Sequence, residues 1–310
     1  MTPSPTVLRV GTRGSALALA QTESLRPALE AATGRSVELV TIISAGDTTT
    51  DSLATIGGTG IFASALRDAL LAGECDALVH SLKDLPPIPH PGLAIAAVPR
   101  RADARDVLCA RGGETLGTLA PGARLGTGSP RRRAQVLARR PDLEVVDIRG
   151  NVDSRLRRVA EGAFDAVVLA AAGLVRLERQ EDITEYFDLD EWPVAPGQGA
   201  LALETREGDE RAFASIDDRP SRIMVDAERE VLRLLEAGCS APIGTHAMID
   251  DGLLFLTAQV YRPDGSDSLT SSHALYLNDS TTPTQDVAQR VAEELLALGA
   301  AELADLGGPA

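Results

Sequence analysis

The chain has 310 residues, 44% of them apolar, and a formal net charge of -15 at pH 7. A chain of this length usually divides into more than one domain, and its apolar content excludes an intrinsically disordered protein. The negative charge argues against general binding to nucleic acid. Three scattered cysteines cannot form a disulfide framework, and neither they nor the four histidines show the spacing of metal ligands.

The beginning of the chain lacks the pattern of a secretion signal. No cationic segment there precedes an apolar one, and no apolar run in the chain approaches the ~20 residues of a membrane span. We therefore expect a soluble, cytoplasmic protein with no membrane partner.

The first hundred residues alternate short apolar segments with helical patterns, which predicts an α/β domain with a largely parallel sheet. The expected strands are 7–10, 37–44 and 77–80, and the expected helices are about 15–31 and 62–72. The pattern repeats after Arg105, with strands at 124–128, 143–148 and 166–170 and helices from Ser129 and Val152. Ser129 can cap its helix, because Pro130 suits the first helical position.

Residues 178–200 break the periodicity and are expected to cross between domains. A further strand is expected at 200–204, and a smaller α+β domain at the end of the chain. That domain is expected to hold a helix capped by Ser221 and strands at 253–261 and 272–277. Residues 282–285 have the spacing of a capping box, so Thr282 is expected to cap a last helix that runs to about Ala304. The domains are thus predicted at 1–99 with 200–219, at 100–199 and at 220–310.

Positive charge is concentrated in one segment. Between Arg100 and Arg158 there are fourteen arginines and seven acidic residues, so the remainder carries -22. Residues 126–129 open a helix whose backbone amides can bind an anion, and Arg131, Arg132 and Arg133 follow. At ~100° per residue, only one or two of the three can face a shared ligand. Arg149 and Arg155 could converge there, although a solvated basic face is the alternative.

Arginine outnumbers lysine 29 to 1, and the single lysine is Lys83. It lies with Asp84 just after an expected strand, where open α/β sheets bind ligands. Asp84 could stabilise a cation or donate a proton, or it could simply cap backbone amides in a loop.

Cys239 follows a helix and a glycine, so its sulfur is expected to be accessible, whereas Cys75 and Cys109 are expected to be buried in strands. A buried structural role for Cys239 is the alternative. The segment 11–15 places Arg13 at a helix start but lacks the spacing of a nucleotide-binding loop.

Eight segments together resemble the porphobilinogen deaminase family in order and spacing. They are GTRGSALALAQ, GGTGIFASAL, HSLKDLP, GTGSPRRRAQ, IRGNVDSRL, LAAAGLVRL, APGQGALALE and GCSAPIG. The resemblance covers nearly the whole chain. It implies two α/β domains like those of type II periplasmic binding proteins, with an active cleft between them, and a smaller α+β domain that carries the cofactor cysteine.

The resemblance also implies roles for single residues. Cys239 would carry a dipyrromethane by a thioether bond, and Asp84 would be the catalytic carboxylate. The residues expected to bind the cofactor are Cys239, Ser81, Lys83, Asp84, Thr127, Ser129, Arg131, Arg132, Gly150, Arg155, Gln198 and Gly199. Those expected to bind substrate carboxylates are Arg13, Ser15, Arg149, Arg155 and Arg176. No metal is expected.

The implied activity is the stepwise, deaminative joining of four porphobilinogen molecules to the cofactor, followed by release of hydroxymethylbilane by water for tetrapyrrole and heme biosynthesis. Asp84 would stabilise an azafulvene-like cation formed from porphobilinogen. Thr55 and Thr59 stand where many members carry lysines, which puts the ionic contacts of that loop in question. We expect a monomer whose partner is its small-molecule substrate.

Two other interpretations are open. One is a two-lobed protein that binds a small anion without catalysis, against which the missing signal sequence and the Cys239 segment count. The other is an inactive homologue, which the presence of both Asp84 and Cys239 disfavours.

Overall fold

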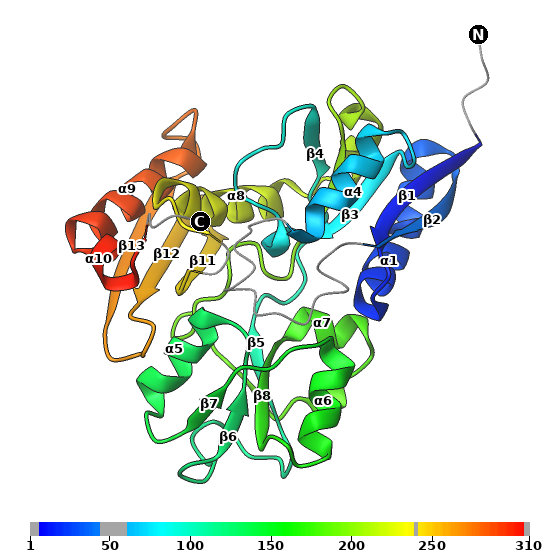
Figure 1. The fold of residues 1–310 in the computed structure, drawn as a ribbon. Helices are drawn as coiled ribbons and strands as arrows, with labels where there is room; N and C mark the ends of the chain where they lie inside the picture. Colours follow the sequence, from blue (N-terminus) through cyan, green and yellow to red (C-terminus); the bar gives the residue numbers. More distant parts are fainter. Residues whose placement is uncertain (1–5, 44–60, 239–240, 307–310) are drawn as a thin grey trace. The chain divides into compact units, whose positions relative to one another are not determined.

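A computed structural model describes residues 6–43, 61–238 and 241–306. The chain forms two compact units, residues 1–102 with 200–222 and residues 103–199 with 223–310 (Figure 1). Each of the three predicted domain ranges holds one sheet, and the boundaries themselves stay a prediction. None of the helices in the described ranges is both long and apolar enough to cross a bilayer.

The first unit contains a five-stranded sheet in the order β2-β1-β3-β10-β4. Its strands are β1 (Val7–Arg13), β2 (Ser36–Ile42), β3 (Ala77–Ser81), β4 (Leu93–Ala97) and β10 (Leu201–Arg206). β1, β2 and β3 are parallel, whereas β10 runs antiparallel to β3 and β4. The sheet is therefore mixed rather than largely parallel, because β10 joins it from a distant part of the sequence.

Two helices belong to this sheet, α1 (Ala16–Thr33) and α4 (Ile61–Leu71). Ser15 caps α1, since its hydroxyl accepts a hydrogen bond from the Ala18 amide at 3.2 Å. Gly34, at φ 65°, ends the same helix in the left-handed conformation that glycine adopts without strain. Leu29 of α1 packs with Leu8 and Val10 of β1 in the core.

The second sheet repeats this arrangement in the order β7-β6-β8-β5-β9. Its strands are β5 (Asp106–Ala110), β6 (Arg124–Gly126), β7 (Glu144–Val146), β8 (Ala166–Ala170) and β9 (Glu185–Tyr186). β6, β7 and β8 are parallel, and β5 is the antiparallel strand next to the edge. Helices α5 (Pro130–Arg139), α6 (Val152–Ala160) and α7 (Ala171–Arg176) accompany them, and the predicted Ser129 cap and Pro130 start of α5 are confirmed.

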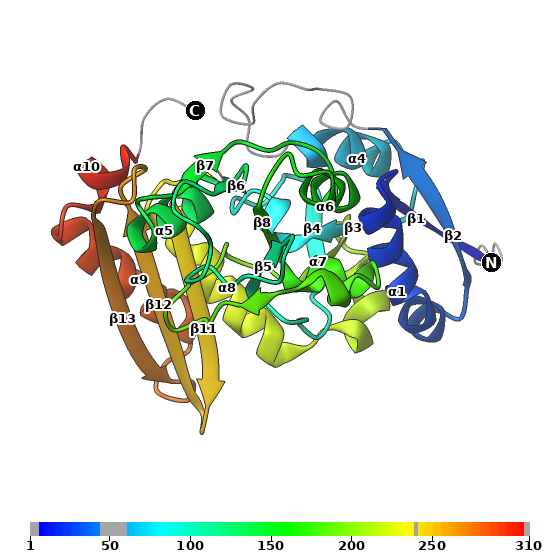
Figure 2. The same ribbon diagram turned by 90° about the horizontal axis from the view of Figure 1, so that it is seen from below.

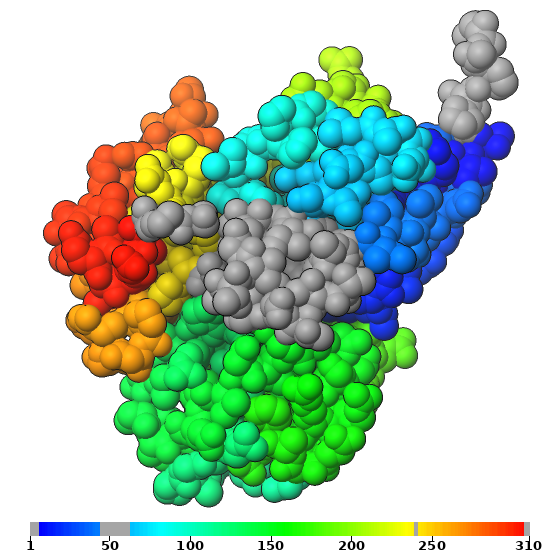
Figure 3. Space-filling model, in the orientation of Figure 1, coloured from blue at the N-terminus to red at the C-terminus, as the bar shows by residue number. Residues whose placement is uncertain are grey.

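The third sheet is antiparallel and consists of β11 (Ile243–Asp250), β12 (Leu253–Tyr261) and β13 (Ser268–Tyr276). Helices α9 (Pro283–Ala297) and α10 (Ala300–Ala304) lie along it (Figure 2), and α8 (Arg219–Leu234) contributes to the same core. The turn between β12 and β13 lies against α5 (Figure 3). A Cβ on Gly265 in that turn would come within 2.5 Å of the Ala134 carbonyl, so this contact requires glycine.

Two predicted helix caps are wrong. The Asp218 carboxylate, not Ser221, caps α8 by accepting from the Ser221 amide at 3.0 Å, and the Ser221 hydroxyl accepts instead from the Arg101 amide. Thr282 makes no capping bond, and its hydroxyl donates to Asp286. The last helix also stops at Ala297, because Gly299 at φ 94° separates it from α10.

Candidate active site

The segment that carries Asp84 is a tight turn with fixed ends. β3 ends at Ser81 and continues into a one-turn 3-10 helix, Leu82–Asp84. Leu82 and Leu85 are each 1% exposed, and the Leu82 amide donates to the carbonyl of Ala200 at 3.0 Å. These contacts hold both ends of the turn, while Asp84 is exposed and Lys83 is half-buried. An exposed carboxylate on a rigid turn can act on a ligand without moving the backbone.

Arg13 and Ser15 belong to the same edge of the first sheet. Arg13 is the last residue of β1, and Ser15 follows at the start of α1. Because β1 and β3 are parallel neighbours, their carboxyl ends share one edge. The structure thus brings Arg13 and Ser15 to the edge from which the Asp84 turn extends.

In the second unit, the centre of the arginine cluster is a carboxylate that the sequence reasoning missed. Asp106, at the start of β5, is 0% exposed. Its oxygens accept hydrogen bonds from Arg131 at 2.8 Å, Arg132 at 2.6 Å, the Gln198 amide at 2.8 Å and the Trp192 indole at 3.0 Å. Burial would raise the pKa of Asp106, but the two guanidinium groups hold that pKa well below its usual value.

Arg131 and Arg132 both turn inward from α5. Arg131 also donates to the Gln135 side chain at 2.7 Å and to the Pro193 carbonyl at 3.3 Å, and burial lowers its pKa. The Nε atoms of Arg131 and Arg132 are buried without a hydrogen-bond partner in the described part of the chain. Arg133 is exposed and bonds the carbonyl of Val145. Two guanidinium groups share one carboxylate, so the buried cluster keeps a surplus of positive charge.

Arg149 and Arg155 add to that surplus. The Arg155 side chain donates to the Gly150 carbonyl at 2.8 Å, and Arg149 pairs with Asp147 at 3.3 Å. Burial, together with the positive charges of Arg132 and Arg149, lowers the pKa of Arg155 to about 10. A guanidinium that is repelled in this way is stabilised by a bound anion.

The other predicted residues of this unit lie around the same edge of the second sheet. Thr127 follows β6 and its hydroxyl accepts from the Ser129 amide at 3.2 Å. Arg176, whose pKa burial lowers, ends α7 and donates to the Gly199 carbonyl at 2.9 Å. Gln198 is buried and also bonds the Ala104 carbonyl. Since β6, β7 and β8 are parallel, the segments that follow them share one edge.

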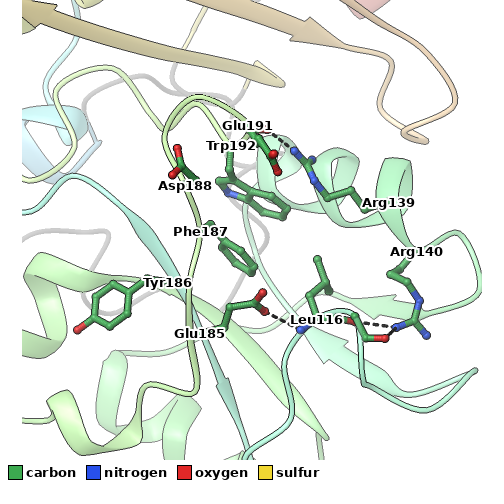
Figure 4. A pocket seen from close by; sticks show the side chains of 10 residues that line it. Leu116, Arg139, Arg140, Glu185, Tyr186, Phe187, Asp188, Glu191 and Trp192 are labelled. Atoms are coloured by element: carbon green, nitrogen blue, oxygen red, sulfur yellow. Dashed lines mark hydrogen bonds between the residues drawn. The ribbon is translucent and has the colours of Figure 1, made fainter.

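A separate cavity of about 360 Å³ in the second unit contains none of the predicted site residues (Figure 4). Arg140 at its wall is bonded to Asp142, and Glu185 accepts from the Leu116 amide. Trp192 stacks on Phe187 with ring centres 4.2 Å apart, and its indole N–H reaches Asp106. One residue of the cavity wall, Trp192, therefore helps to hold Asp106.

The two described cysteines have unreactive surroundings. Cys75 and Cys109 are buried and not disulfide-bonded. Burial raises the pKa of Cys75 to about 11 and that of Cys109 to about 12. Their thiols are therefore poor nucleophiles at neutral pH. Cys239, Thr55 and Thr59 lie outside the described residues. In the part that the structure covers, no group of three or more His, Cys, Asp or Glu side chains could hold a metal.

The fold and these residues define an α/β protein with two mixed sheets, a smaller antiparallel third sheet and a surplus of buried positive charge in the second unit. Residues 8–214 match the model of the porphobilinogen deaminase dipyrromethane cofactor binding domain, and residues 223–297 match that of the porphobilinogen deaminase C-terminal domain. The chain belongs to the porphobilinogen deaminase family. This confirms the resemblance found in the sequence and the presence of a dipyrromethane-binding domain, and it favours an enzyme over a binding protein without catalysis.

Curated relatives extend over nearly the whole chain. Porphobilinogen deaminase of Leifsonia xyli subsp. xyli is 59% identical and the match covers 97% of this chain and 95% of that protein. Porphobilinogen deaminase of Thermobifida fusca is 47% identical, with 97% and 96% covered. Among solved structures, the methionine-binding protein MetQ is 13% identical with a TM-score of 0.42, and the match covers 69% of this chain and 90% of that one.

Proposed function

We propose that this chain is a transferase, a hydroxymethylbilane synthase, that joins four porphobilinogen molecules with loss of ammonia from each and releases the linear product by hydrolysis. The observation that carries the proposal is the surplus of buried arginine charge around Asp106, in a chain whose relatives are named porphobilinogen deaminases. Each porphobilinogen brings two carboxylates, and fixed guanidinium groups suit such ligands. In each joining step the C–N bond of porphobilinogen breaks with release of ammonia, a C–C bond forms to the free ring carbon of the bound chain, and that ring carbon loses its proton.

The residues of the second unit fit a carboxylate-bearing dipyrromethane. The unpartnered Nε atoms of Arg131 and Arg132 and the repelled guanidinium of Arg155 are groups that an anion would satisfy. When bound, the dipyrromethane supplies the carbon to which the first porphobilinogen is joined. We assign its binding, besides Cys239, to Ser81, Lys83, Asp84, Thr127, Ser129, Arg131, Arg132, Gly150, Arg155, Gln198 and Gly199.

Asp84 is assigned the catalytic role. Loss of ammonia leaves a positive charge on the former porphobilinogen, and a fixed carboxylate stabilises such a charge because it needs little reorganisation. The buried Leu82 and Leu85 keep its backbone in place. Arg13, Ser15, Arg149, Arg155 and Arg176 are assigned to the acetate and propionate groups of the incoming substrate.

The cofactor attachment is assigned to Cys239, supported by the burial and raised pKa values of Cys75 and Cys109. We further propose that the protein works as a cytoplasmic monomer without nucleic acid or membrane partners. Its net charge of -15 argues against general binding to nucleic acid.

Intact mass spectrometry tests the function and the attachment together. The parent protein is expected to be heavier than its chain by one dipyrromethane and to convert porphobilinogen to hydroxymethylbilane. Cys239→Ser should be folded but should lack both the added mass and the activity, because a hydroxyl is a far weaker nucleophile than a thiolate. The matched controls Cys75→Ser and Cys109→Ser should keep the added mass. Added mass in Cys239→Ser would show that the attachment lies elsewhere.

A further inference from the structure

The first unit contains a buried charged cluster that the proposed mechanism does not use. It consists of Arg67 in α4, His80 in β3 and Glu204 in β10, whose side chains are 9%, 7% and 3% exposed. Arg67 binds the Glu204 carboxylate through Nε at 3.1 Å and through a terminal nitrogen at 2.8 Å. The Nε2 atom of His80 lies 3.2 Å from the other carboxylate oxygen. Three elements are thus joined through one carboxylate.

The ionised carboxylate of Glu204 determines which ring atom of His80 faces it. Burial raises the pKa of Glu204, but the bonds from His80 and Arg67 outweigh burial and bring that pKa to about 2. An ionised carboxylate only accepts hydrogen bonds, so Nε2 of His80 must carry the proton that it donates. The ring of His80 is therefore held with its Nε2 hydrogen directed at Glu204 for as long as Glu204 is charged.

The cluster adjoins the end of β3, from which the Asp84 turn continues. His80 is the residue before Ser81, where β3 ends and the turn begins. In the ladder between β10 and β3, Ala202 pairs with His80 and Leu201 with Ser81, and the next bond joins the Leu82 amide to Ala200. The His80–Glu204 bond adds a side-chain link between the same two strands, three residues before Lys83 and four before Asp84.

We propose that Glu204, held by Arg67, is a positioning residue that acts through His80 to fix the Asp84 turn in its reactive geometry. The inference rests on the catalytic role assigned to Asp84 in the proposed function. A displacement of about 1 Å in a reacting group can reduce a rate by about a hundredfold. In protein that already carries its cofactor, loss of the cluster should therefore lower kcat while leaving KM for porphobilinogen nearly unchanged, since the groups assigned to the substrate carboxylates lie on other segments of the chain.

The test compares His80→Ala with His80→Gln in purified protein that carries its cofactor. The glutamine amide reaches the position of Nε2 and can donate to Glu204, whereas alanine cannot. We expect His80→Ala and Glu204→Gln to lower kcat about tenfold to a hundredfold with KM within threefold of the parent, and His80→Gln to restore kcat to within threefold. The added mass should be the same in all of them.

Two controls separate positioning from general damage. His273→Ala removes another histidine that is bonded to a glutamate, His273 to Glu294 at 2.8 Å on the third sheet, and should not change kcat. Val37→Ala weakens the core of the first unit away from the cluster and should lower the melting temperature without lowering kcat of the loaded enzyme.

The outcomes are distinct. The proposal is overturned if His80→Ala keeps kcat within twofold of the parent, or if His80→Gln loses as much kcat as His80→Ala. It is equally overturned if Val37→Ala lowers kcat by as much at a matched loss of melting temperature. If Glu204→Gln does not fold, the comparison of His80→Ala with His80→Gln still tests the proposal. A parent without the added mass, or an active Asp84→Asn, would instead refute the proposed function.

Discussion

The two α/β sheets share a strand order but use buried charge differently. In each, the antiparallel strand next to the edge carries a buried carboxylate, Glu204 in β10 and Asp106 in β5, bonded by arginine from a helix. Glu204 meets one arginine and a histidine, so its charge is balanced locally. Asp106 is paired with two arginines, so this cluster keeps a net positive charge. In the proposed function, the balanced cluster supports the turn of Asp84, the carboxylate assigned to a cation, and the unbalanced cluster belongs to the residues assigned to anions.

If this division of roles is right, the largest effect should come from Asp84, the exposed carboxylate of the first unit. Asp84→Asn keeps the shape but removes the charge that offsets the cation and any proton that the group delivers. Each contribution is worth about 10²-fold or more, so a loss of kcat above about a hundredfold is expected, with the cofactor mass retained. The rate of ammonia release in a single turnover measures this loss. A rate within tenfold of the parent would leave Asp84 as an ordinary loop aspartate.

In the second unit, Asp106→Ala should chiefly reduce stability. It leaves the buried guanidinium groups of Arg131 and Arg132 without their carboxylate, and breaking a buried pair costs about 3 to 5 kcal/mol. Urea unfolding at neutral pH measures the loss. Asp103→Ala is the matched control, because its pair with Arg105 is partly exposed and should contribute less than about 1 kcal/mol. Equal losses in the two variants would contradict the central role of Asp106.

The Glu204 cluster should make the first unit sensitive to acid. The pKa of Glu204 in the folded protein, about 2, lies below its ordinary value of 4.5. The charged carboxylate therefore stabilises the fold fully above pH 4.5, and this stabilisation is lost as the pH falls toward 2. The shift corresponds to about 3 kcal/mol. In melting curves from pH 7 to pH 3, the difference between the parent and Glu204→Gln should therefore shrink below pH 4.5. A constant difference over that range would show that the charge of Glu204 does not stabilise the fold.

Local structure is easier to predict from the sequence than are buried ion pairs, because the residues of an ion pair can lie far apart along the chain. Ser129 and Pro130 start their helix as predicted because a cap depends on residues within one turn, although Thr282 shows that a suitable spacing does not guarantee the bond. Asp106 and Glu204 escaped notice because their partners lie far along the chain, as Arg67 and Glu204 do. The available signal was an acidic residue next to apolar residues of a strand. Asp106 opens the strand Asp106–Ala110, and Glu204 follows three apolar residues in Leu201–Arg206.

The smallest effect concerns the cysteines, of which each unit buries one. Burial raises the pKa of Cys75 in the first unit to about 11 and that of Cys109 in the second to about 12, so both stay protonated and shielded at pH 8. If Cys239 carries the cofactor, native protein should then take up no iodoacetamide at pH 8. Two alkylations should follow denaturation, because the chain has three cysteines and the tether blocks one. Cys239→Ser should give the same two. Peptide mapping locates the labels, and labelling of Cys75 or Cys109 before denaturation would show that the corresponding sheet opens more readily than its buried core implies.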